Sequence, residues 1–166
     1  TVNVTVRISE LPRVDGIETT DWTDYDNTIT INSTNPAAYE YALDGLNFQD
    51  ENTFTNLISG LYTVTIRDKA GCGVIQKTVW LLNYPKYFTP NGDGFNETWY
   101  IKNQQFEPDF TVEIYGRFGK WMKSFKSNTL GWDGNYNGSP NFATDYWFVV
   151  HRQDGRIHKG HFALKR

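Results

Sequence analysis

Hydrophobic and polar residues alternate in short runs along the first half of the chain. Residues 1–8 place valine or isoleucine at every second position, which is the period of a strand with one buried face. Glycine, proline and Asp-Gly signals separate this run from later ones and mark turns. The pattern therefore predicts short strands around residues 1–8, 29–31, 39–43, 62–66 and 74–82.

The second half shows the same alternation. Residues 111–115 alternate, and residues 121–125 follow a glycine turn as the expected return strand of a hairpin. Residues 146–150 are apolar at every position, so we expect a central strand buried on both faces. Residues 157–164 form the last predicted strand. Because no window shows a 3.6-residue apolar stripe, we expect an all-β chain.

Length and strand spacing suggest how the chain is divided. Its 166 residues suffice for one large or two small domains, and the regular spacing of short strands is typical of β-sandwiches. A proline-containing stretch, Asn83-Tyr84-Pro85, separates the halves. We predict two immunoglobulin-like β-sandwich domains in tandem, residues 1–83 and 84–166, joined by this short linker.

Composition narrows the class of protein. The net charge is −3, so we expect no nucleic-acid partner, and no apolar run approaches the ~20 residues of a membrane span. The single Cys72 cannot form an internal disulfide, whereas aromatic residues make up 16% of the chain and can stabilise it by packing. The sequence has neither an initial methionine nor a signal-peptide pattern. We therefore expect a monomeric internal or C-terminal part of a longer polypeptide.

A dense turn-forming stretch, Phe88-Thr89-Pro90-Asn91-Gly92-Asp93-Gly94-x-Asn96, opens the second half. Four further blocks follow in order at residues 114–119, 132–138, 145–147 and 159–166. Together they resemble the type B C-terminal sorting domain of the type IX secretion system, also called the gliding-motility-associated C-terminal domain. Glu97 departs from the pattern, because the family usually has aspartate there.

The resemblance implies a folded address tag that works by protein–protein recognition. Its implied partners are the outer-membrane type IX translocon, its shuttle proteins and a covalently attached N-terminal passenger. The passenger would be exported through the periplasm and outer membrane to the cell surface or the medium. The residues selected as recognition or structural signature are Pro90, Asn91, Gly92, Asp93, Gly94, Asn96, Trp99, Arg117, Gly119, Trp132, Asp133, Gly134, Tyr146, Trp147, Gly160, Lys165 and Arg166.

The first half carries a resemblance of its own. Its residues Tyr41-x-Leu43-Asp44-Gly45, Gly60-x-Tyr62-Thr63-Val64 and Asp68-x-x-Gly71-Cys72 resemble the immunoglobulin-like repeats of large surface adhesins that precede such sorting domains. This resemblance implies a spacer between the tag and its cargo.

One loop offers several oxygen ligands of the kind that calcium prefers, from Asn91, Asp93, Asn96 and Glu97. The spacing fails the EF-hand template, because Phe95 stands at its fifth position and Lys102 replaces the bidentate glutamate. The same side chains satisfy backbone donors in ordinary turns. The expected cofactor is therefore none, with calcium as an open alternative.

Catalytic residues are not evident. His158 and His161 lie an odd number of positions apart on a predicted strand and should point to opposite faces, which disfavours a zinc site. Cys72 lies in the other half from every histidine, so no nucleophile and base are visible, and we expect it to be a small buried side chain. We predict that the chain is not an enzyme.

Two alternatives stay open for exposed side chains. Arg117 either presents its guanidinium to a carboxylate of a partner or forms an internal ion pair with Asp133 or Glu113. Trp121, Trp132 and Trp147 either form a sugar-stacking platform or belong to the core. The first option for the tryptophans defines an alternative function, a carbohydrate-binding surface adhesin module.

Overall fold

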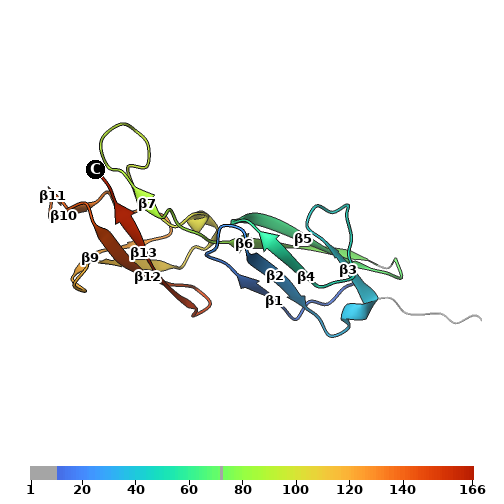
Figure 1. Cartoon of the computed structure of the whole chain (residues 1–166). Helices are drawn as coiled ribbons and strands as arrows, with labels where there is room; N and C mark the ends of the chain where they lie inside the picture. The colour runs from blue at the N-terminus through green and yellow to red at the C-terminus, as the bar shows by residue number, and fades with distance from the viewer. Residues whose placement is uncertain (1–10, 72) are drawn as a thin grey trace, which may run out of the picture. The chain divides into compact units, whose positions relative to one another are not determined.

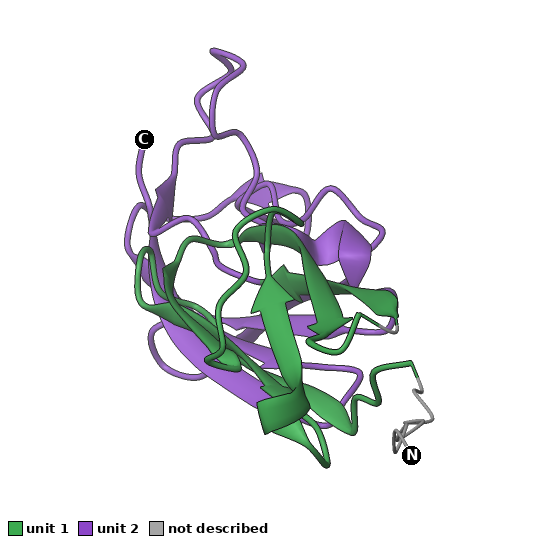
Figure 2. Ribbon diagram, turned by 90° about the vertical axis from the view of Figure 1, so that its right-hand side faces the viewer, with its two compact units in different colours: residues 1–81 green, residues 82–166 purple. Residues whose placement is uncertain are grey.

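The computed structural model describes residues 11–71 and 73–166, so the predicted strand at residues 1–8 and Cys72 lie outside the described residues. The chain forms two compact units, unit 1 ending at Leu81 and unit 2 covering residues 82–166 (Figure 2). Apart from two 3-10 turns, η1 (Pro36–Ala38) and η2 (Gln104–Phe106), every regular element in the described part is a strand. The all-β fold class is confirmed.

Unit 1 consists of two three-stranded antiparallel sheets. One has the strand order β1-β2-β4 and the other β3-β5-β6 (Figure 1). The strands are β1 (Gly16–Thr20), β2 (Asn27–Asn32), β3 (Tyr39–Ala42), β4 (Thr53–Leu57), β5 (Gly60–Asp68) and β6 (Val74–Leu81). The sequence pattern did not indicate β1 and β4, since each has few apolar residues.

The core of unit 1 is mainly aliphatic. Ile29 and Ile31 are fully buried and pack with Val64, Ile66 and other side chains of the second sheet. This alternation of isoleucine with threonine explains why β2 buries every second residue. The two sheets are thus held together by many medium-sized side chains.

A buried asparagine fixes the loop that leads into β2. The Asn27 side chain is fully buried, and its Oδ1 accepts hydrogen bonds from the backbone N and the Oγ1 of Thr23 at 3.0 and 2.8 Å. Its Nδ2 donates to the carbonyl oxygens of Thr23 and Leu57 at 3.0 and 2.8 Å. Because all of its polar capacity is used, Asn27 ties this loop to β4.

Unit 2 is organised around one five-stranded sheet of order β7-β13-β12-β8-β9. The pairing of β7 with β13 is parallel and the others are antiparallel. The strands are β7 (Tyr87–Phe88), β8 (Thr111–Tyr115), β9 (Trp121–Lys126), β12 (Asp145–His151) and β13 (Ile157–Leu164), with a small hairpin of β10 (Asn135–Tyr136) and β11 (Ser139–Pro140).

Among the described residues, side chains cover one face of this sheet and leave the other largely exposed. Along β12, Tyr146, Phe148 and Val150 are buried whereas Trp147 is 42% exposed. The prediction that residues 146–150 are buried on both faces is therefore wrong. The apolar run misled the prediction because Trp147 and Val149 lie on the uncovered face, where a tryptophan or valine can remain half-exposed.

The covering layer is built mostly from irregular segments. Trp99 and Trp132 exchange two backbone hydrogen bonds of 2.8 and 2.9 Å in an isolated antiparallel bridge. Both side chains are fully buried. The Trp99 ring stacks on Phe162 of β13 at 3.9 Å between centroids and 13° between planes. A few large rings thus replace a second regular sheet.

A buried ion pair supports the other end of this layer. Arg152 Nη2 lies 2.7 Å from Glu107 Oε2, and the two side chains are 4% and 3% exposed. Glu107 Oε1 also accepts a hydrogen bond from the backbone N of Gln153 at 3.1 Å. The pair attaches the segment after η2 to the β12–β13 turn.

The segment that we expected to be a linker belongs to unit 2. Asn83 is buried, and its carbonyl oxygen accepts a 2.7 Å hydrogen bond from the backbone N of Lys102. The units divide between Leu81 and Leu82, two residues before the predicted boundary. Within residues 11–71 and 73–166, no helix reaches the length and apolarity that a membrane span requires.

Candidate functional site

Part of the signature forms the core of unit 2. Trp99, Trp132 and Tyr146 are buried, and the Trp132 ring meets Tyr146 edge-on at 4.8 Å. Each indole N–H finds a backbone acceptor: Trp99 Nε1 donates to the carbonyl of Pro85 and Trp132 Nε1 to that of Asn135, both at 2.8 Å. These residues set the shape of the unit and are not available to a partner.

Two signature glycines leave room for neighbouring side chains. A Cβ at Gly160 would lie 2.7 Å from the Phe148 ring and 2.9 Å from the Tyr84 hydroxyl. A Cβ at Gly134 would lie 2.8 Å from Leu164 and 3.2 Å from Pro90. Both contacts are closer than packed atoms tolerate, so these positions need glycine for packing.

The loop at residues 89–97 is held by its own polar side chains. Asp93 Oδ1 accepts a 2.8 Å hydrogen bond from Phe95 N, Asn91 Oδ1 one of 3.1 Å from Asp93 N, and Glu97 Oε1 one of 3.0 Å from Gly94 N. The bond from Phe95 N, followed by that from the Asn91 side chain, lowers the pKa of Asp93.

Left-handed backbone angles explain the choice of other residues in this loop. Gly92, Gly94 and Asn96 have φ of 83°, 88° and 50°, values that glycine adopts freely and asparagine tolerates. Side-chain oxygens of Asn91, Asp93 and Glu97, three of the four residues proposed as calcium ligands, already accept hydrogen bonds from the loop backbone. Among the described residues, no three His, Cys, Asp or Glu side chains group as a metal site, and calcium binding stays a prediction.

The structure brings the signature segments together at one end of the sheet, where β7, β8 and β13 end and β9 and β12 begin. We call this the signature end and define it as residues 89–97, 116–120, 133–134, 141–144 and 165–166. Figure 1 shows the loop after β7 and the β10–β11 hairpin beside the C-terminus.

Several contacts join these segments to one another. Lys165 N donates to the carbonyl of Phe88 at 3.0 Å, Gly134 packs near Pro90 and Leu164, and Lys120 Nζ lies 4.2 Å above the Tyr136 ring. Loop 89–97, the final residues, the β10–β11 hairpin and the Arg117 turn thus share one surface.

Exposed aromatic side chains project from three loops of the signature end. Phe118 is 93%, Phe142 88% and Phe95 73% exposed. The charged side chains of Arg117, Lys165 and Arg166 lie on the same end. Sequence reasoning selected the charges but missed Phe118 and Phe142, because only the fold reveals that these rings find no place in the core.

Arg117 is not held in the ion pair that the sequence offered. Glu113 Oε2 lies 3.3 Å from His151 Nε2 and accepts a 3.1 Å hydrogen bond from the Tyr115 hydroxyl. Asp133 instead accepts hydrogen bonds from Asn135. Within the described residues neither carboxylate pairs with Arg117.

Of the two alternatives for Trp121, Trp132 and Trp147, the core applies to Trp132, which is therefore not part of a sugar-stacking platform. Trp132 is fully buried because it belongs to the layer that covers the sheet. Trp121 and Trp147 are 50% and 42% exposed and lie on the opposite, open face, together with Tyr115.

The histidines do not converge. His158 faces inward, with its ring 5.8 Å from that of Phe148, whereas His161 is exposed on the open face beside Trp147. Burial, with Lys86 and Arg152 nearby, lowers the pKa of His158 to about 4.

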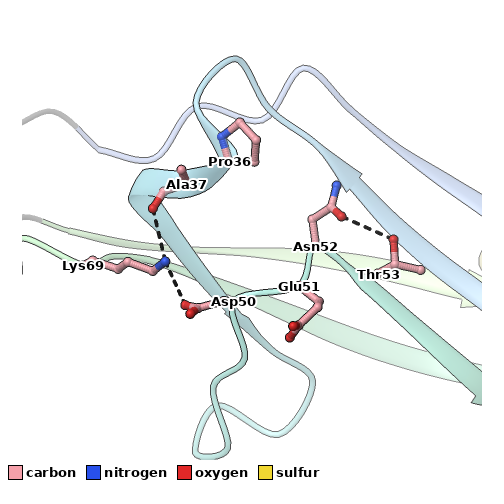
Figure 3. A pocket seen from close by; sticks show the side chains of 7 residues that line it. All are labelled: Pro36, Ala37, Asp50, Glu51, Asn52, Thr53 and Lys69. Atoms are coloured by element: carbon pink, nitrogen blue, oxygen red, sulfur yellow. Dashed lines mark hydrogen bonds and ion pairs between the residues drawn. The ribbon is translucent and has the colours of Figure 1, made fainter.

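Unit 1 contains an open hollow of about 550 Å³ (Figure 3). Its lining residues are Pro36, Ala37, Asp50, Glu51, Asn52, Thr53 and Lys69. Lys69 Nζ lies 2.8 Å from Asp50 Oδ1 and donates to the Ala37 carbonyl at 3.1 Å. Two of the three charged side chains that line the hollow, Lys69 and Asp50, thus bind each other.

Comparison with known proteins gives one family. The CHU_C Type IX secretion signal domain matches residues 82–164. No curated protein matches the chain, whereas 22 chains of solved structures do.

Three of these structures cover most of the chain at low identity. The BSP domain of a biofilm-associated protein is 14% identical over 92% of this chain and 29% of its own (TM-score 0.33). Latent dimeric PorU from Porphyromonas gingivalis is 13% identical, and the match covers 92% of this chain and 20% of the PorU chain (TM-score 0.31). The fibronectin(III)-like modules of Clostridium thermocellum CbhA are 12% identical, and the match covers 90% of this chain and 92% of theirs (TM-score 0.27). The chain thus spans less than a third of the first two.

Proposed function

The chain belongs to the CHU_C type IX secretion signal domain family, and on this premise we propose that unit 2 is a folded signal that directs a passenger through the type IX secretion system. One observation carries the proposal: the family match covers residues 82–164, and the compact unit covers residues 82–166. The matched segment is thus a complete folding unit with its own core.

We propose that the secretion machinery recognises the signature end. Its backbone is held by hydrogen bonds within loop 89–97 and by the bond from Lys165 N to Phe88. A surface that is already ordered loses little conformational entropy on binding. The exposed rings of Phe118 and Phe142 offer apolar contact area, and the guanidinium of Arg117 suits a carboxylate of the partner.

The remaining parts of the proposal concern the whole protein. The passenger would precede unit 2 and be delivered to the cell surface or the medium. Unit 1 would act as a spacer repeat, and the passenger would be an adhesin or a motility-associated protein. The interaction would be protein–protein recognition without bond chemistry in this chain.

The test fuses the 166-residue chain behind a signal peptide and a fluorescent cargo in cells with and without the translocon. We expect translocon-dependent display of the cargo at the surface. A fusion carrying only residues 1–81 should remain in the periplasm. Folded cargo that stays in the periplasm with the whole chain attached would refute the sorting role.

The role of the signature end is tested with matched charge variants. Arg117→Ala, alone and with Lys165→Ala and Arg166→Ala, should reduce display several-fold while unit 2 stays folded. Lys126→Ala removes an exposed cation from the opposite end of the same sheet and should have no effect. If both ends respond equally, recognition lies elsewhere on unit 2.

A further inference from the structure

The open face of the five-stranded sheet carries a row of aromatic side chains. Trp147 of β12 is paired with Tyr115 of β8, and Tyr115 is paired with Trp121 of β9. Paired residues on adjacent strands point to the same face. His161 of β13 continues the row on the other side, with its ring 6.4 Å from that of Trp147. The row therefore crosses four adjacent strands.

These rings are accessible and one of them is fixed. Trp121 and Trp147 are 50% and 42% exposed. The Tyr115 hydroxyl donates a 3.1 Å hydrogen bond to Glu113, whose carboxylate also lies 3.3 Å from His151. The row is thus bordered by groups that can exchange hydrogen bonds with a polar ligand.

The charge of this face favours an uncharged ligand. The strand register places Lys126, Lys159, Glu113 and Asp145 on it, and Lys165 joins them because its Nζ lies 4.4 Å above the ring of Tyr87, which is paired with Ala163 on this face. Three cations and two carboxylates leave a net charge of only +1, and Trp121, Tyr115 and Trp147 carry no charge. An anionic lipid surface or nucleic acid would find little net attraction here.

The row by itself is too small to form a stable interface with a second copy of the chain. Two half-exposed tryptophans and one less exposed tyrosine offer roughly 250–300 Å². A stable protein–protein interface needs about 800 Å² from each partner. The row suffices for a narrow ligand that lies along it.

We propose that the row of Trp121, Tyr115 and Trp147 binds an extended, neutral, β-linked polysaccharide. Adjacent strands lie about 4.8 Å apart, so the outer rings are separated by roughly 10 Å, a distance on the scale of a disaccharide. Sugar rings with equatorial hydroxyls present flat C–H faces to aromatic rings and hydroxyls to Glu113, His151 and His161. Because Trp121, Tyr115 and Trp147 lie side by side on three adjacent strands, the row suits a chain of sugars and not a single sugar. The row contains none of the residues that define the signature end, although Tyr115 and Trp121 flank residues 116–120, and its binding does not depend on the sorting role.

The test is affinity electrophoresis of the full chain in gels containing hydroxyethylcellulose, xylan or galactomannan, with alginate as an anionic comparison. We expect at least one neutral glycan to retard the chain, and Trp147→Ala and Trp121→Ala each to weaken binding at least tenfold. Trp147→Phe should retain most of the binding, because it keeps a ring and controls for folding. Phe118→Ala and Phe142→Ala remove exposed rings from the signature end and should change nothing.

Several outcomes would overturn the proposal. One is that none of the three neutral glycans retards the chain. A second is that the double variant Trp121→Ala/Trp147→Ala is retarded as strongly as the unchanged chain while it keeps the native melting temperature. A third is that only alginate retards the chain. A concentration-dependent dimer in sedimentation that Trp147→Ala abolishes would assign the row to self-association instead.

Discussion

The two units build all-β structures of similar size in different ways. Unit 1 pairs two regular three-stranded sheets over an aliphatic core, whereas unit 2 has one five-stranded sheet covered by irregular segments and by Trp99 and Trp132. In unit 1 the packing is spread over many equivalent side chains. In unit 2 the packing depends on a few aromatic rings and on glycines that leave room for neighbouring side chains. A sequence signature can therefore be dense in unit 2, because single residues there decide the shape.

The largest expected effect comes from removing an indole of the covering layer. Trp99→Ala deletes the stack on Phe162 and the hydrogen bond to Pro85, and should lower the stability of unit 2 by about 3–5 kcal/mol. Denaturation of the full chain should then show an earlier transition for unit 2 and an unchanged one for unit 1. Ile31→Val in unit 1 removes one methyl group from the aliphatic core and should cost only about 1 kcal/mol. A loss of similar size for Trp99→Ala would contradict the inference that a single ring carries much of the stability of unit 2.

The buried ion pair of unit 2 gives the next effect. Arg152→Met leaves Glu107 buried without its cation and should cost about 3 kcal/mol. The double variant Glu107→Leu/Arg152→Met removes both charges and should recover most of that loss. Urea titration of the three proteins measures both steps. A double variant as unstable as the single one would mean that the carboxylate matters mainly through its bond to Gln153.

The hydrogen bonds of the buried Asn27 side chain in unit 1 should contribute less to stability than the Trp99 ring or the Arg152–Glu107 ion pair. Asn27→Ala leaves the Thr23 and Leu57 carbonyls without their donor and should destabilise unit 1 by about 1–3 kcal/mol. The control is Thr28→Ala, at the next position of β2, which removes a half-buried side chain whose hydroxyl shares only an exposed 2.9 Å hydrogen bond with Thr20. Hydrogen exchange at residues 21–26 should accelerate in the first variant only.

Acid should weaken unit 2 through His158. Its folded pKa is lowered from 6.5 to about 4, so the folded state keeps the imidazole neutral while the unfolded chain binds a proton between these values. Stability from this group is complete above pH 6.5 and is lost as the pH falls toward 4, by about 1–2 kcal/mol once partial exposure is discounted. His158→Gln should flatten the pH profile of the melting temperature over this window. An unchanged slope would assign the acid sensitivity to other groups.

Calcium should have the smallest effect. The oxygens of Asn91, Asp93 and Glu97 already accept hydrogen bonds from the loop, so millimolar calcium or a chelator should move the melting temperature of the chain by less than about 1 °C, well below the several degrees per kcal/mol of a small domain. A larger shift that Asp93→Asn abolishes would establish a calcium site.

Strand positions were predictable wherever one face is buried. Residues 62–66 and 111–115 alternate clearly, and β5 and β8 lie there. β1 and β4 were missed because they contain only one and two apolar residues, so tertiary pairing and not local pattern makes them strands. β7, with two residues in a proline-rich segment, is defined only by its partner β13.

The candidate site was predictable as a set of segments but not as a surface. Glycine, proline and asparagine residues made the turn at residues 116–119 and the loop at residues 89–97 recognisable in the sequence. That they lie at one end of a sheet follows from the strand order, which alternation cannot reveal. The burial of Trp132 and the exposure of Phe118 likewise depend on which segments cover the sheet.

The position of β13 between β7 and β12 has a consequence for biosynthesis. β13 is an interior strand of the sheet, so a product truncated before Ile157 leaves β7 without a partner strand, opens one edge of β12 and removes the Phe162 ring on which Trp99 stacks. Such a product cannot complete the core of unit 2, and a partner that recognises the folded unit would not bind it.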